Sequence, residues 1–185
     1  MHLHAQFSQP AVQDEGISQQ ASLLVSILIR YPELVSIRYG SANGDLLFSF
    51  LVNGICSETE IGEFQHTLYT HLSAYMEFTR RRGFLFHLHV MQHGEHTLVE
   101  MIRDVATLSQ QELSLILNLT RNTFGSRLIY EIEEPLREEE NSLQDEMIDQ
   151  ILEDVRVMGT HRELVGYRES GRVFVFNRSP MEVSE

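Results

Sequence analysis

Apolar and polar positions alternate between residues 83 and 104, and the rest of the predicted fold is arranged around this stretch. One set of alternate positions is apolar and the other contains four histidines. The apolar set is Phe84, Phe86, Leu88 and Val90, and the histidines are His87, His89, His93 and His96. A period of two is typical of a β-strand with two unlike faces. Because Gly94 and Glu95 form a turn between two such runs, we expect an antiparallel hairpin.

The two-residue turn also predicts the register of this hairpin. Counting back from the turn, His89 lies opposite Glu100 and His87 lies opposite Ile102. The face that holds these residues is partly polar. We therefore expect the apolar face to point toward the core.

His87, His89 and Glu100 form a candidate metal site. Imidazole suits zinc, copper, iron or nickel, so a divalent transition metal is the cofactor that this set implies. His93 lies about 13 Å further along the strand than His89, so the histidines of the hairpin do not all share one ion. Two other interpretations stay open. The face is an ordinary polar sheet surface, or its charge changes near neutral pH and tunes self-association.

Similar patterns predict the remaining elements. We expect helices over residues 17–30, 57–82, 109–124 and from residue 141 or 142 to about residue 157. We also expect hairpins over residues 33–53 and 163–178, and a strand over residues 127–132. Ser57 with Glu60, and Ser109 with Glu112, have the spacing of capping boxes at two helix starts. A strand precedes each box. The chain therefore contains two predicted repeats of strand, link and helix.

This order of elements predicts an α+β domain with a mostly antiparallel sheet of hairpins and helices packed on one face. Residues 45–132 alone follow the β-α-β-β-α-β order of a ferredoxin-like core. Helix-hairpin additions then lie at both ends. In such a core the strand at residues 45–53 already has two neighbours, so the strand at residues 33–39 conflicts with it. A larger sheet and a different sandwich are both open.

The predicted organisation is a single domain between two tails. Residues 1–16 are polar and form a flexible N-terminal tail, and residues 180–185 form a frayed C-terminal tail. The domain spans residues 17–179, with a core at 33–132 and a C-terminal helix-hairpin at 141–178.

Composition narrows the class of protein. The formal net charge of −13 argues against a nucleic acid or an anionic membrane as a partner. The longest apolar stretch, residues 21–29, is shorter than the roughly 20 residues that span a bilayer. The single cysteine, Cys56, excludes an internal disulfide framework and fits a reducing compartment. We expect a soluble, cytoplasmic protein.

Two charged stretches offer weaker candidate sites. Arg80, Arg81 and Arg82 end the second helix, where they either bind an anion or stabilise the negative pole of the helix dipole. Residues 131–154 contain eleven acids and one arginine, which form either a cation site or a solvated acidic face. Within this stretch, residues 138–141 are predicted to form a solvated loop. Their spacing matches no calcium-binding loop.

No phosphate loop, dinucleotide fingerprint, nucleophile elbow or zinc-protease helix is present in the sequence. We therefore expect a non-enzymatic interaction or regulatory module that self-associates, as a dimer, or binds a protein partner. An apolar first helix, an amphipathic fourth helix and an acidic surface favour this hypothesis. The alternative is a metal-binding protein or metal-dependent enzyme that uses His87, His89 and Glu100. A third is a small-ligand site near the three arginines.

Overall fold

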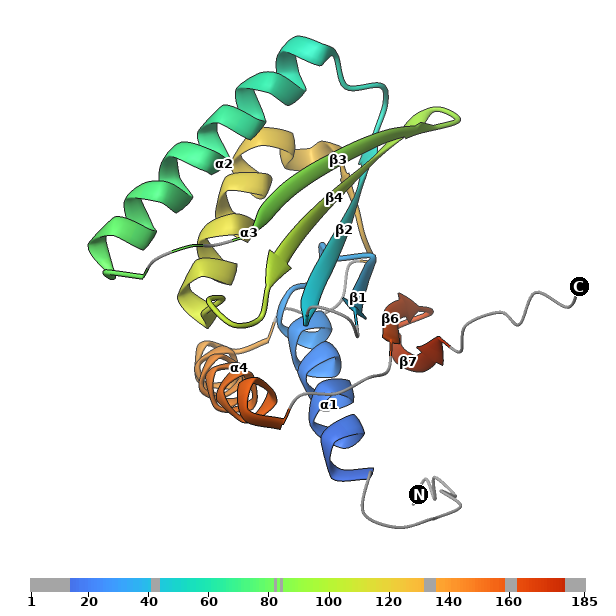
Figure 1. Cartoon of the computed structure of the whole chain (residues 1–185). Helices are drawn as coiled ribbons and strands as arrows, with labels where there is room; N and C mark the ends of the chain where they lie inside the picture. The colour runs from blue at the N-terminus through green and yellow to red at the C-terminus, as the bar shows by residue number, and fades with distance from the viewer. Residues whose placement is uncertain are drawn as a thin grey trace, which may run out of the picture.

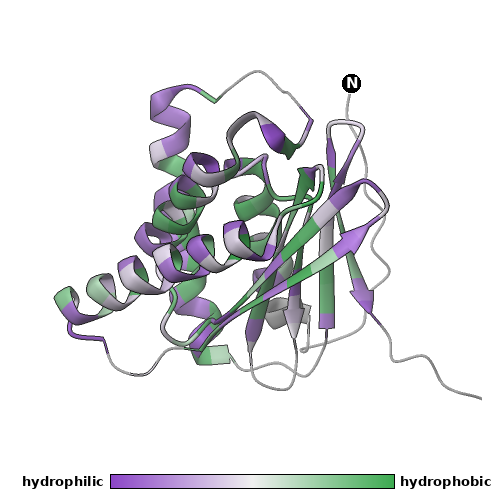
Figure 2. Ribbon diagram, turned by 90° about the horizontal axis from the view of Figure 1, so that it is seen from above, coloured by the Kyte–Doolittle hydropathy of each residue, from purple (hydrophilic) through white to green (hydrophobic). Residues whose placement is uncertain are grey.

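A computed structural model describes residues 14–40, 44–81, 83, 85–131, 136–158 and 163–178. Within these residues, four α-helices pack against one face of a seven-stranded antiparallel sheet (Figures 1 and 2). The predicted α+β class, with helices on one face of an antiparallel sheet, is therefore confirmed.

The sheet joins all three hairpins through their edges. Its strands are β1 (Ser36–Gly40), β2 (Asp45–Asn53), β3 (Phe86–His93), β4 (His96–Asp104), β5 (Leu128–Ile129), β6 (Glu163–Glu169) and β7 (Arg172–Arg178). The strand order is β3-β4-β2-β1-β6-β7, and β5 pairs with β2 outside this path. All the strand pairs are antiparallel.

The strands β1 and β5 pair with different parts of the same edge of β2. This arrangement resolves the predicted conflict, in which the strand at residues 33–39 had no free edge of β2 to pair with. β1 pairs with residues 45–49 of β2, and β5 pairs with residues 51–52. Both fit because β5 is only two residues long, much shorter than the predicted strand over residues 127–132. β2 and β3 are both antiparallel to β4, which lies between them, so they run parallel to each other in a split βαβ arrangement.

The helices are α1 (Asp14–Arg30), α2 (Glu58–Phe78), α3 (Gln110–Phe124) and α4 (Glu138–Met158), with a short 3-10 helix, η1 (Gly125–Arg127), after α3. The prediction that residues 138–141 form a loop was wrong, because α4 begins at Glu138. Three glutamates in its first turn face the positive end of the helix dipole. The Glu140 carboxylate also accepts a hydrogen bond from the Arg137 N–H at 2.8 Å.

Both predicted N-caps are present, and each glutamate of the two boxes has a further role. Ser57 Oγ accepts from the Glu60 N–H, and Ser109 Oγ accepts from the Glu112 N–H. The Glu60 carboxylate pairs with Arg127, while the Glu112 carboxylate pairs with an arginine of β4. The β2–α2 and β4–α3 units thus share a cap and an arginine-bound glutamate, as expected of two structural repeats.

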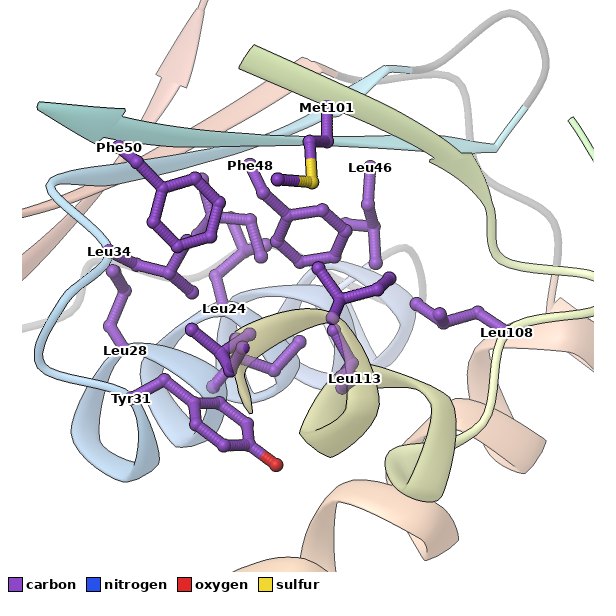
Figure 3. Packing of buried hydrophobic residues seen from close by; sticks show 14 of the residues in the cluster. Leu24, Leu28, Tyr31, Leu34, Leu46, Phe48, Phe50, Met101, Leu108 and Leu113 are labelled. Atoms are coloured by element: carbon purple, nitrogen blue, oxygen red, sulfur yellow. The ribbon is translucent and has the colours of Figure 1, made fainter. Parts of the chain in front are cut away.

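The core lies between the sheet and the helices (Figure 3). Phe48 and Phe50 of β2 point toward Leu24 of α1 and Leu113 of α3 (Figure 3). Most of the apolar residues of α1 are buried within the chain, because α1 packs against β6 and β7 on one side and against α4 on another; Ile29 is 38% exposed. This helix therefore gives little support to self-association, for which its apolar surface was one of the reasons.

Candidate interaction surface

The sheet has one face under the helices and one face that no described helix covers (Figure 2). Alternation along the strands separates the two faces. On β2, for example, Phe48 points into the core whereas Leu47 and Ser49 lie on the other side. We call this second side the open face. It consists of Ser36, Arg38, Leu47, Ser49, Leu51, His87, His89, Met91, Leu98, Glu100, Ile102, Val165, Tyr167, Phe174 and Phe176.

The centre of the open face is polar. Ser49 of β2 lies opposite both Ser36 of β1 and Glu100 of β4. The Ser49 hydroxyl donates a long hydrogen bond of 3.5 Å to Glu100 Oε1. Arg38 lies one step along β1 from Ser36 and is half-buried. Its Nε is buried and has no hydrogen-bond acceptor among the described residues.

Three stacked rings occupy the β6–β7 end of the open face, and we call them the aromatic cluster. The Tyr167 ring centroid lies 5.7 Å from that of Phe174 and 5.7 Å from that of Phe176. Phe176 is 51% exposed, so this cluster presents an apolar surface to solvent. The turn beside it is held by Glu131, whose carboxylate accepts from the Ser170 N–H at 2.8 Å and the Gly171 N–H at 2.6 Å.

The histidines lie on the β3–β4 end of the same face, in the predicted register. His89 pairs with Glu100, and His87 pairs with Ile102. Both histidines are exposed, while Glu100 is half-buried. No hydrogen bond joins His89 to Glu100, and no three His, Cys, Asp or Glu side chains of the described part of the chain gather closely enough to hold a metal ion. The metal assignment stays a prediction.

The predicted anion site is only partly described, because Arg82 lies outside the described residues. Arg80 is exposed and has a φ of 55°, two residues after the last residue of α2. Arg81 Nη1 instead donates to the Thr107 carbonyl at 2.7 Å. Arg156 of α4 donates to carbonyl oxygens of the same loop. Burial lowers the pKa of Arg156, and the charge of Arg81 lowers it further. Binding of an anion here stays a prediction.

A buried ion pair on the core face of the sheet was not among the sites predicted from the sequence. Arg103 of β4 and Glu112 of α3 are both fully buried. The guanidinium donates to both carboxylate oxygens, from Nε at 2.5 Å and from Nη2 at 2.8 Å. Such two-point geometry is the strongest form of this pair. Arg103 occupies the core-facing set of β4 positions together with Val99 and Met101, so alternation alone signals its burial.

Asp104 extends this network to the loop before α3. Its carboxylate accepts from the Leu85 N–H at 2.8 Å and from the Thr107 hydroxyl at 2.6 Å, and it also pairs with Arg103. Burial works to raise the pKa of Asp104. Hydrogen bonds from Thr107 and Leu85, together with the charge of Arg103, outweigh burial and lower that pKa below its ordinary value. The network fixes the hairpin to the start of α3.

Cys56 lies in the link before α2, where it contacts two neighbouring elements. Its N–H donates to Thr97 Oγ1 at 3.0 Å, and Arg127 Nη2 lies 3.3 Å from its Sγ. These contacts join the link before α2 to β4 and to η1. Cys56 therefore has a packing role just before the start of α2.

Comparisons with known proteins do not assign a function to this surface. In the described part of the chain, no helix combines the length and the apolar character needed to cross a membrane. Searches against protein-family models, curated proteins and solved structures found no match to this chain.

Proposed function

We propose that this chain is a non-enzymatic interaction module that self-associates through the open face of its sheet. The observation that carries the proposal is the aromatic cluster together with Met91, Leu98 and Ile102 on a sheet face that no described helix covers. Exposed apolar side chains that gather on one face, with polar residues between them, mark interaction surfaces. An antiparallel sheet with one solvated face usually has polar residues there.

Two further features favour binding over catalysis. The polar network of Arg103, Asp104 and Glu112 is occupied by contacts within the chain and fixes the fold. A depression at the exposed start of α4 is lined by Arg137, Glu138, Glu139 and Ser142. Its lining is charged or hydroxylated, whereas small-molecule sites are mostly apolar and enclosed.

Sedimentation equilibrium of the full chain tests this proposal. We expect wild type to associate reversibly, and Phe176→Asp to weaken association at least tenfold because it places a charge in the aromatic cluster. Val157→Asp is the matched control, since Val157 is 87% exposed and belongs to α4 rather than to the open face. A monomeric wild type at all accessible concentrations would refute the proposal. So would equal effects of the two variants.

A further inference from the structure

We infer that two copies of this chain pack open face against open face about a twofold axis, with Arg38 of each copy facing Glu100 of the other. This inference rests on the proposed function and specifies the geometry of the interface. A second copy is the expected partner of the open face, because both members of the charge pair lie on this one surface.

Arg38 and Glu100 do not pair with each other within the chain. Arg38 is on β1 and Glu100 is on β4, with β2 between them. Arg38 lies opposite Leu47 of β2 and Glu100 lies opposite Ser49, so the two positions are offset by two residues along the strands. Strand spacings place their Cα atoms about 11–12 Å apart. Neither side chain has an ion pair within the described residues, and the Arg38 Nε lacks an acceptor there. Two half-buried opposite charges thus remain available to an interface.

Twofold symmetry allows Arg38 and Glu100 to form two equivalent contacts between the two copies. In an isologous interface, if residue i of one copy contacts residue j of the other, then j also contacts i. A rotation axis that lies between the two sheets, midway between Arg38 and Glu100 and perpendicular to the line joining them, exchanges these two positions. Each Arg38 then lies over a Glu100, and the axis passes over β2 near Leu47 and Ser49.

The same rotation brings apolar groups together. The axis runs closer to the strand direction than across it, so the β6–β7 side of one sheet covers the β3–β4 side of the other. The aromatic cluster of one copy therefore lies over the region that contains Met91 and Leu98. Phe176 and Met91 are 51% and 49% exposed, and this contact would bury both. Charge and apolar complementarity thus agree on one arrangement.

A charge-reversal mixing experiment tests this geometry. Arg38→Glu gives a chain with two acids at these positions, and Glu100→Arg gives a chain with two arginines. We expect each variant alone to associate at least tenfold more weakly than wild type, because both contacts become repulsive. An equimolar mixture should associate within about threefold of wild type, since both contacts of the mixed dimer are again between opposite charges. Sedimentation equilibrium measures all four samples.

The outcomes separate the inference from the proposed function. If wild type does not associate, the proposed function fails. If wild type associates and both variants associate equally well, or the mixture is as weak as its components, only this geometry fails. Circular dichroism and thermal unfolding verify that each variant is folded. Should charge reversal prevent folding, Arg38→Gln and Glu100→Gln supply a milder pair, each of which should weaken association about threefold or more.

Discussion

Among contacts between single residues, the buried ion pair of Arg103 and Glu112 is expected to have a large effect on the free energy of unfolding. Replacing Glu112 removes the carboxylate that binds Arg103 at two points and leaves this buried guanidinium with Asp104 as its remaining ion-pair partner. Breaking such a buried pair costs about 3–5 kcal/mol. We predict that Glu112→Leu lowers the free energy of unfolding by about that amount. The double variant Arg103→Met/Glu112→Leu should lose less than Glu112→Leu alone, because it leaves no fully buried charge, and Asp104 keeps its hydrogen bonds from Leu85 and Thr107. Urea unfolding of both variants measures this difference, and a larger loss in the double variant would contradict it.

Asp104 makes stability depend on pH in acid. Its pKa in the folded chain is lower than the ordinary value of 3.8. The stabilisation is therefore complete above the unfolded pKa and is lost as the pH falls through the folded pKa. We predict that Asp104→Asn lowers the free energy of unfolding at pH 7 and that its difference from wild type narrows below about pH 4. Urea unfolding across this range checks the prediction, and a constant difference down to about pH 3 would exclude it.

These two residues differ in how far the sequence predicts their roles. Alternation along β4 places Arg103 on the core side. Its partner is hidden, because Glu112 fits a capping box with Ser109 equally well. Only the packing of α3 against the hairpin shows that the Glu112 carboxylate binds Arg103 while its N–H is capped by Ser109. Local spacing identifies the capped N–H and cannot identify a partner from another element.

At the scale of elements, the β3–β4 hairpin is the best predicted part of the molecule. Strict alternation and a two-residue turn leave one register, and His89 indeed lies opposite Glu100. The pattern predicts which face each residue occupies but not the rotamer of its side chain. The register alone therefore does not show that His87, His89 and Glu100 converge on one ion. The start of α4 shows the opposite case, because a run of glutamates suits a solvated loop and a first helical turn equally.

Metal content decides between the interpretations of this hairpin. His87 and His89 are both exposed and share the open face with Glu100. If they bind a metal, protein purified without a tag should contain about one equivalent of a transition metal by elemental mass spectrometry. His87→Ala/His89→Ala should lose it. Equal metal content in the variant, or none in wild type, would leave these histidines as surface residues.

At the scale of the whole molecule, sheet topology depends on a detail that sequence patterns do not give. β1 reaches β2 only because β5 stops after two residues and leaves the rest of that edge free. The final hairpin then extends the sheet beyond β1 and contributes the aromatic cluster. The open face is therefore assembled from segments more than 100 residues apart, so no local pattern signals that it forms one surface.

Methionine oxidation tests the role of the open face most directly. Met91 on the open face is 49% exposed, while Met147 and Met158 on α4 are 48% and 44% exposed and serve as internal controls. Peroxide converts exposed methionine to the sulfoxide, which mass spectrometry quantifies at each site. We predict that raising protein concentration through the association range slows oxidation of Met91 severalfold and leaves oxidation of Met147 and Met158 unchanged. Association that protects the α4 methionines, or leaves Met91 as reactive as before, would contradict it.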